Sequence, residues 1–291
     1  MKLVFIIGTG RCGSTFVHEI LARHKDIGFI SNVEDNLPFI NNLGRWNNFI
    51  YRSPIGSFTK KGGIRFAPSE AYSLIGREVS PIYAYSYRDL MSQDVTPWLE
   101  SRFKDFFGRR FIVQGKPVFS HKYTGWPRIR FFSQIFPDAR FIHIVRDGRA
   151  VANSWLQMDW WCGYRGPENW LWGPLPPALH DEWMVSGGNF PVLAALSWKL
   201  LINAFEESES ILGSKRYMRL RYEDILSEPE EHFRNMLEFC GLEWTGDFRH
   251  ILSRQQILKD RSRAFERDLT PSQVISIETV LGPLLERYGY A

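Results

Sequence analysis

The sequence has few cysteines, no long apolar run and no large excess of charge, and each absence narrows the class of protein. Its 291 residues include only three cysteines, an odd and widely spaced set that favours a reducing compartment and leaves no pair with metal-ligand spacing. No apolar run reaches the roughly 18 residues of a membrane-spanning helix. The opening MKLVFIIG is too short for the apolar core of a signal peptide. We therefore expect a cytoplasmic protein with no membrane span and no metal site.

The charge balance and the composition favour a globular protein with an anionic ligand. The formal net charge is +4 at pH 7, which is mildly basic, and the charges are spread along the chain without a nucleic-acid recognition motif. Hydrophobic residues make up 44% of the chain and aromatic residues 15%, which is enough to bury a large core. We find no internal repeat, and we expect no nucleic-acid partner.

A further absence lies inside the first motif. Residues 5–15 read FIIGTGRCGST, so an apolar strand leads into a glycine loop and then into a helix that begins at Ser14. Amides of such a loop, together with the helix N-terminus, can hold a phosphate. The spacing from Gly8 to Gly13 matches a P-loop, but Ser14 stands where a nucleoside triphosphatase has its lysine, and the nearest cation is Arg11. Triphosphate chemistry with Mg²⁺ needs that lysine. A tight turn without a ligand is the alternative reading.

Short apolar runs alternate with helical patterns along the whole chain. This alternation indicates an α/β fold, a single domain with a central parallel β-sheet covered by helices on both faces. A break by Pro97 divides a helical pattern over 85–107, and residues 41–81 read as loops and turns. We expect strands at 3–7, 28–31, 118–121, 139–145 and 217–225, and helices at 14–23, 129–136, 191–210, 229–240 and 271–288, with one more helix beginning after Asp147.

Two motifs together resemble the sulfotransferases that use 3′-phosphoadenosine 5′-phosphosulfate (PAPS), in particular the bacterial and carbohydrate-type members. GTGRCGST resembles their 5′-phosphosulfate loop. FPDARFIHIVRDGRAVANSW, at 136–155, is similar to their 3′-phosphate segment, with Arg146 at a strand end and Ser154 eight residues later. RLRYEDI at 219–225 is similar to the stretch after their last core strand, and KDRSRAFERDLT near the C-terminus resembles their basic closing loop. The resemblance implies a P-loop NTPase-like sulfotransferase fold and transfer of a sulfuryl group from PAPS, with adenosine 3′,5′-bisphosphate (PAP) as product.

The resemblance also implies roles for individual residues. Arg11 would neutralise the 5′-phosphate and the departing oxygen, and Lys122 would be a second cation facing the sulfate. A guanidinium at Arg146 and a hydroxyl at Ser154 suit a phosphate monoester. The implied cofactor-binding residues are Gly10, Arg11, Cys12, Gly13, Ser14, Thr15, Arg146, Ser154, Arg261 and Arg263.

The general base that takes the proton of an acceptor hydroxyl has two candidates. Glu34, in SNVED after the second expected strand, matches the place where several relatives hold a glutamate. His121, next to Lys122, has the more suitable ordinary pKa. The sequence leaves the choice between them open.

The acceptor is indicated only by a tryptophan-rich stretch at 159–190, expected to be irregular. Its five tryptophans could form an acceptor pocket for a small molecule, a carbohydrate or a lipid, or could fill a loop core or a dimer contact. Two other functions stay open: a P-loop kinase-like phosphotransferase with a displaced lysine, and a nucleotide-binding module without catalysis. The oligomeric state is not indicated.

Overall fold

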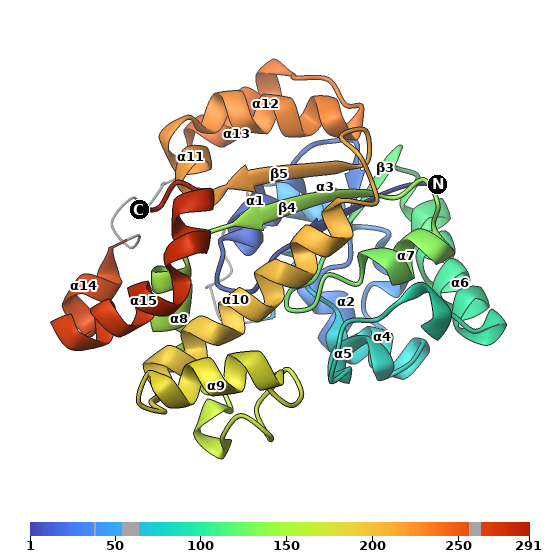
Figure 1. The fold of residues 1–291 in the computed structure, drawn as a ribbon. Helices are drawn as coiled ribbons and strands as arrows, with labels where there is room; N and C mark the ends of the chain where they lie inside the picture. Colours follow the sequence, from blue (N-terminus) through green and yellow to red (C-terminus); the bar gives the residue numbers. More distant parts are fainter. Residues whose placement is uncertain (38, 54–63, 256–262) are drawn as a thin grey trace.

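A five-stranded parallel sheet organises the protein (Figure 1). The computed structural model describes residues 1–37, 39–53, 64–255 and 263–291. The strands run in the order β2-β3-β1-β4-β5, so the first strand lies at the centre. They are β1 (Lys2–Ile7), β2 (Ile27–Gly28), β3 (Val118–Lys122), β4 (Arg140–Val145) and β5 (Tyr217–Arg221). The α/β fold with helices around a central parallel sheet is thus confirmed.

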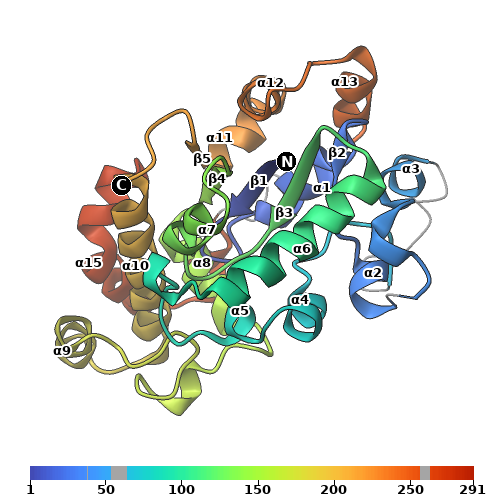
Figure 2. The ribbon, with the colours of Figure 1, turned by 90° about the vertical axis from the view of Figure 1, so that its right-hand side faces the viewer.

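Helices connect the strands and cover both faces of the sheet (Figure 2). Before β4 they are α1 (Ser14–Leu21), α2 (Asn32–Asn36), α3 (Asn47–Arg52), α4 (Tyr72–Glu78), α5 (Ile82–Tyr85), α6 (Pro97–Gln114) and α7 (Ile129–Ile135), with 3₁₀ turns η1 (Asn42–Gly44) and η3 (Ser92–Asp94). After β4 come α8 (Gly148–Leu156), η4 (Gly163–Arg165), α9 (Pro177–Val185), α10 (Phe190–Glu209), α11 (Tyr222–Ser227), α12 (Pro229–Cys240), α13 (Gly246–Ser253), α14 (Ala264–Asp268) and α15 (Pro271–Arg287).

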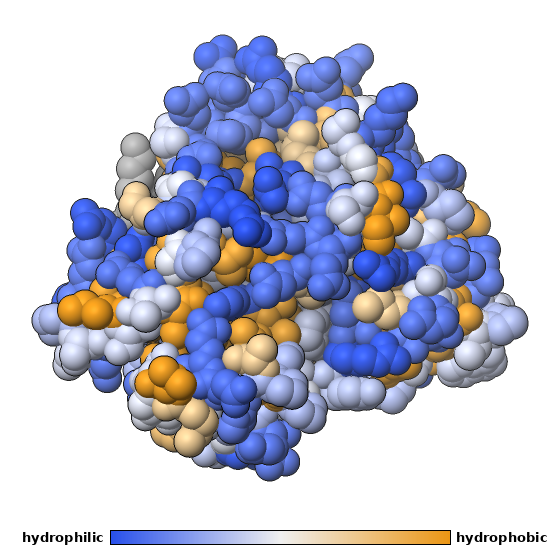
Figure 3. Space-filling model, viewed as in Figure 1, coloured by the Kyte–Doolittle hydropathy of each residue, from blue (hydrophilic) through white to orange (hydrophobic). Residues whose placement is uncertain are grey.

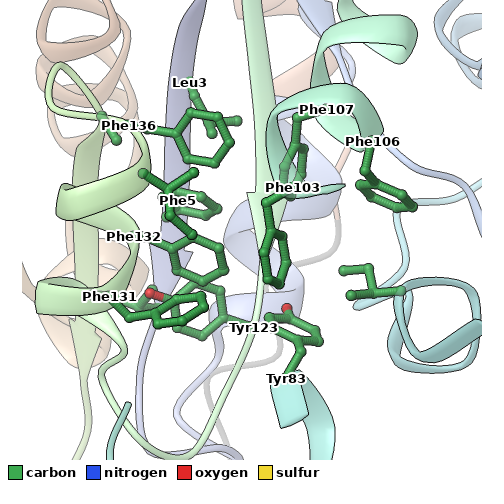
Figure 4. Packing of buried hydrophobic residues seen from close by; sticks show 14 of the residues in the cluster. Leu3, Phe5, Tyr83, Phe103, Phe106, Phe107, Tyr123, Phe131, Phe132 and Phe136 are labelled. Carbon is green, nitrogen blue, oxygen red and sulfur yellow. The ribbon is translucent and has the colours of Figure 1, made fainter. Parts of the chain in front are cut away.

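The side chains of β1 alternate between two cores, as the period of a strand requires. Phe5 points into an aromatic core with residues of α6 and α7, where its ring stacks on Phe132 at a centroid distance of 4.5 Å (Figure 4). Val4 and Ile6 point the other way, into a core with α1, α12 and α13. Both faces of the central strand are therefore buried, which is why its sequence is a continuous apolar run.

A third core joins α8, α10 and α15 with the segment that follows α8. Trp198 of α10 is fully buried there, and its ring meets Tyr288 edge-on at 6.3 Å. Gly148 begins α8 directly against this indole, since an added Cβ would lie 2.7 Å from a ring carbon of Trp198. This packing fixes the direction in which α8 leaves β4.

Several element boundaries differ from those expected from the sequence. Pro97 does not separate two helices but occupies the first turn of α6, with the Thr96 hydroxyl accepting from the Leu99 amide, and the helix continues to Gln114. The second strand is shorter than expected because the Gln114 side chain takes both backbone hydrogen bonds of Phe29. Residues 41–81 contain α3 and α4 as well as turns, and the tryptophan-rich stretch contains α9.

The face of the molecule seen in Figure 3 is mainly hydrophilic, with apolar side chains in smaller groups. Over the described ranges, we find no helix that combines the length and the apolar character needed to cross a bilayer. The cytoplasmic location expected from the sequence stays a prediction.

Candidate active site

The carboxyl ends of four strands meet at one edge of the sheet, and the residues that follow them face one cavity. Register places Ile6 of β1 beside Lys122 at the end of β3, and Ile7 beside His143 of β4. The glycine loop follows β1, Arg146 follows β4 and Tyr222 follows β5. In open parallel sheets this edge is where ligands bind, because the loops that leave neighbouring strands diverge there.

The glycine loop is held in a conformation that points backbone amides toward a ligand. Gly10, Arg11 and Gly13 all have positive φ angles, of 88°, 55° and 90°. Such turns form a concave nest of N–H groups, and α1 begins directly after it. Gly13 also has no room for a side chain, because an added Cβ would lie 2.1 Å from a ring carbon of Tyr222. The loop therefore has the shape of an anion site.

The two motifs identified in the sequence come together around this loop. Arg11 donates from Nε to the Ser154 hydroxyl at 2.9 Å, and Arg146 donates to the Arg11 carbonyl at 3.0 Å. The Arg146 guanidinium lies over the Tyr222 ring, 5.1 Å from its centroid. The cations expected to hold the 5′- and 3′-phosphates thus lie at one site, and Tyr222 supports both the loop and Arg146.

Lys122 reaches the same site from β3. Its Nζ donates to the Thr15 hydroxyl at 2.7 Å and to the Glu70 carboxylate at 2.5 Å. Thr124, two residues after Lys122, donates to the same Glu70 oxygen at 3.4 Å. The Lys122 side chain is 7% exposed and that of Glu70 25%, so the carboxylate is the more accessible member of the pair.

Local structure explains why Glu70 stands at this place. The two residues before Glu70 are held by the segment that follows β2, where Ser69 donates its amide to the Ile30 carbonyl at 2.9 Å and Pro68 pairs with Ser31. The Ser69 hydroxyl also bonds the Asp35 carboxylate, which in turn accepts from the Leu74 amide in the first turn of α4. Glu70 is thereby fixed between a backbone bridge and a helix start.

These groups line one large cavity of about 1210 Å³. Its cationic lining residues, among those described, outnumber its acids six to three, which favours an anionic ligand. One part of the lining comes from the glycine loop, Lys122, Arg146, Ser154 and Tyr222. Another part is aromatic and apolar: Tyr72, Ala84, Tyr85, Trp126, Met158, Trp160, Trp170, Leu171 and Trp172. Polar residues, among them Arg128, Arg165, Asn153, Gln157 and Asn169, complete the lining.

His121, one of the two expected bases, does not reach this cavity. Adjacent residues of a strand point to opposite faces, so with Lys122 in the cavity His121 points into the aromatic core of Figure 4. Its ring is fully buried and its Nε2 bonds the Tyr83 hydroxyl at 2.9 Å. Burial, with smaller contributions from nearby Lys122 and Arg110, lowers the pKa of His121 to about 3. The structure therefore argues against His121 as the base.

Glu34, the other expected base, does not line the cavity either. It lies in α2 and turns toward α6, where Arg110 Nε donates to its carboxylate at 2.7 Å. Both side chains are 1% exposed, and Arg110 also bonds Glu78. Burial raises the pKa of Glu34, although Arg110 and Asn47 oppose the shift. An acceptor cannot touch this carboxylate, so the expectation of a catalytic Glu34 is not supported.

The remaining expected site residues divide between the cavity, the core and the surface. Ser14 and Thr15 line the cavity, whereas the Cys12 side chain is fully buried in the core beneath the loop. Arg263 is exposed and pairs with Glu266. Arg261 lies outside the described residues.

Sequence reasoning missed two residues that the structure places at the site. Glu70 lay in a stretch interpreted as loops, and no local pattern separated it from other exposed acids. Tyr222 stood within the RLRYEDI segment, whose resemblance was noted without a role for the ring. Its position directly after the fifth strand, at the same edge as Arg146, was the available signal.

Comparison with known families matches residues 4–171 and 180–246 to the sulfotransferase family. The chain belongs to the sulfotransferase family. The matched residues include the glycine loop, Glu70, Lys122, the Arg146 segment and Tyr222, but not α14 and α15.

Among curated proteins, this sulfotransferase-family chain is 28% identical over 202 residues to the omega-hydroxy-beta-dihydromenaquinone-9 sulfotransferase Stf3 of Mycobacterium tuberculosis (strain CDC 1551 / Oshkosh). The alignment covers 66% of this chain and 46% of that relative. The chain thus spans less than half of the length of the curated relatives it matches.

Solved structures support the sulfotransferase fold. Sulfotransferase STF9 from Mycobacterium avium superposes with a TM-score of 0.57 at 13% identity, covering 98% of this chain and 76% of that one. The sulfotransferase domain from the curacin biosynthetic pathway gives a TM-score of 0.52 at 14% identity, covering 97% of both chains. At these identities the likeness concerns the fold alone.

Proposed function

We propose that this protein transfers the sulfuryl group of PAPS to a hydroxyl group of a small acceptor. The observation that carries the proposal is the convergence of the glycine loop, Arg11, Arg146 and Ser154 beside the Lys122–Glu70 pair in one cavity. Family membership supports the reaction class. We also propose that the whole chain serves as one sulfotransferase domain, with residues 159–190 on the acceptor side.

The loop residues fit the donor. Backbone amides from Gly10 to Thr15 and the start of α1 suit the 5′-phosphosulfate, with Arg11 as the nearest cation. Arg146 and the Ser154 hydroxyl suit the 3′-phosphate. The guanidinium of Arg146 can donate two charge-assisted hydrogen bonds to a phosphate monoester, and the hydroxyl can donate a neutral one. Arg263 is the described member of the expected closing loop.

Glu70 replaces Glu34 and His121 as the proposed general base. PAPS supplies the sulfuryl group: a bond forms between acceptor oxygen and sulfur, and the bond from sulfur to the bridging oxygen breaks with its electron pair going to PAP. Glu70 takes the hydroxyl proton, since it is the accessible carboxylate beside Lys122. Lys122 neutralises charge on the departing side and donates to the Glu70 carboxylate at 2.5 Å.

Relatives differ in their acceptors, so family membership leaves the acceptor open. The Stf3 relatives are named for a hydroxylated menaquinone, a lipid-like alcohol. The aromatic and apolar residues of the cavity support an acceptor with an apolar body for this chain as well.

Calorimetric titration tests the donor. We expect PAP to bind wild-type protein and ATP with Mg²⁺ not to bind. Arg146→Ala should weaken PAP binding by about 2 kcal/mol, the loss of one charge-assisted pair. Arg219→Ala is the matched control, because Arg219 pairs with Glu209 and does not line the cavity. Binding of ATP with Mg²⁺ alone would support the kinase-like alternative, and PAP binding without turnover of any acceptor would support the non-catalytic module.

A further inference from the structure

One part of the cavity lining is rich in aromatic and apolar side chains. We call it the tryptophan wall; its residues are Trp126, Met158, Trp160, Trp170, Leu171 and Trp172. The indole N–H of Trp170 donates to the Gly173 carbonyl. The indole nitrogens of Trp126 and Trp172 are buried away from solvent. Trp170 therefore offers a ring face to a ligand, whereas the indole N–H groups of Trp126 and Trp172 have no hydrogen-bond partner within the described residues.

The tryptophan wall is partly fixed and partly exposed. Trp172 is fixed, because its ring meets Trp155 at 5.6 Å and Trp170 at 6.4 Å, and these residues belong to the core with α8 and α10. Trp160 is 43% exposed and Leu171 45% exposed at the cavity. Large apolar groups left in water at the edge of a pre-formed cavity are typical of a binding surface.

A second segment continues the apolar lining. Tyr72, Ala84 and Tyr85 line the same cavity, and Tyr85 is 83% exposed. The two segments touch, since an added Cβ at Gly173 would lie 2.3 Å from the Tyr87 carbonyl oxygen. The apolar surface thus extends from the buried indoles to exposed rings.

Several polar side chains of the described lining are engaged within the protein. Arg128 donates to the carbonyls of Thr124 and Trp126, and Asn153 and Gln157 donate to Asp268, whereas Arg165 and Asn169 line the cavity as well. Of the acids in the described lining, Glu19 pairs with Arg65, and Asp268 pairs with Arg267 and Asn153. Glu70 is the third acid and stands beside Lys122. A sugar needs several convergent polar partners, and an acidic peptide needs a cluster of cations; the tryptophan wall supplies neither.

We propose that the acceptor is a neutral alcohol with a long apolar body, a lipid-like alcohol. Its hydroxyl lies at Glu70 and its apolar body lies along the tryptophan wall. This proposal rests on the proposed function, because it takes the Glu70 end of the cavity as the place of sulfuryl transfer.

A series of 1-alkanols from ethanol to decanol, each with PAPS, tests the proposal. Each methylene that enters the apolar surface should raise kcat/KM about fourfold, until the chain outgrows the wall. A kcat/KM that does not change with chain length overturns the proposal. So does a higher kcat/KM for N-acetylglucosamine or for an acidic tyrosine peptide than for decanol.

Two tryptophan variants test whether the preference for long alkanols depends on the tryptophan wall. Trp160→Ala should lower kcat/KM for decanol about tenfold and kcat/KM for ethanol by a smaller factor, so that kcat/KM depends less on chain length than in the wild type. Trp98→Ala is the matched control, because Trp98 is similarly exposed, at 57%, but lies on α6 and does not line the cavity. Equal effects of the two variants on decanol turnover overturn the proposal.

PAP titration distinguishes failure of the proposed acceptor class from failure of the proposed function. Normal PAP binding with sulfation of sugars or peptides in preference to alkanols refutes only the acceptor class. Absence of PAP binding, or of PAPS consumption with every acceptor, refutes the proposed function and the acceptor class with it. We expect both tryptophan variants to bind PAP as the wild type does.

Discussion

Two of the pairs between a glutamate and a basic side chain lie in different surroundings, which give them different tasks. Lys122 and Glu70 lie in the cavity, with Glu70 25% exposed. Arg110 and Glu34 lie in the core, each 1% exposed. The same chemical groups can move a proton with a substrate in the first place and can only hold elements together in the second. Accessibility, and not residue type, separates them.

Glu70→Gln gives the sharpest test of this comparison. Without a carboxylate to accept the acceptor proton, kcat should fall about 10³-fold, within the usual range for loss of a general base. The free energy of unfolding should change little, because the amide can still accept from Lys122. Steady-state turnover with PAPS and decanol, together with urea unfolding, measures both quantities. A kcat within threefold of wild type would remove Glu70 from the mechanism.

Glu34→Gln should show the opposite pattern. The variant leaves the buried Arg110 with Glu78 as its remaining carboxylate, so the free energy of unfolding should fall by about 3 kcal/mol. Turnover by the folded protein at low temperature should stay near that of wild type. Loss of kcat without loss of stability would contradict a structural role for Glu34 and would indicate a catalytic one.

The buried His121 should make the free energy of unfolding depend on pH. Its pKa of about 3 in the folded protein lies below its ordinary value of about 6.5, so between these values the unfolded state binds more protons. Stability should therefore be complete above pH 6.5 and decrease as the pH falls, by about 1.4 kcal/mol per pH unit for this residue. His121→Gln should reduce that slope while retaining turnover. Urea unfolding from pH 7 to pH 5 measures the slope, and the exposed His250→Gln is the control. An unchanged slope in His121→Gln would contradict the burial argument.

The sequence predicted the parts of the site that lie in contiguous motifs. Arg11, Thr15, Arg146 and Ser154 were identified because two contiguous motifs resemble those of the PAPS-dependent sulfotransferases, and the strand ends that carry these motifs meet at one edge of the sheet. Lys122 was identified through the same resemblance, and the structure shows it to be the last residue of β3.

The general base could not be predicted in this way. Glu70 owes its position to the bridge between Ser31 and Pro68 and to the start of α4, contacts that join segments far apart in the chain. Glu34 and His121 each lay at a plausible place in the sequence. For His121, the alternation of β3 decided between it and Lys122, but which face would hold the cavity depended on packing against α1 and α6. The tryptophan wall likewise required the fold, because Trp126 and Trp172 come from separate segments.

The order of the strands has a consequence for refolding. β1 lies between β3 and β4, so Lys2 pairs with Val118 and Val4 with Arg140, and the chain must close loops of more than a hundred residues before either pair forms. Such non-local pairing makes folding slow. Because the glycine loop extends from β1, it meets Lys122 and Arg146 only after both pairings are complete. Recovery of PAP binding after dilution from denaturant should therefore follow recovery of helical signal, and the delay would report the insertion of this one strand.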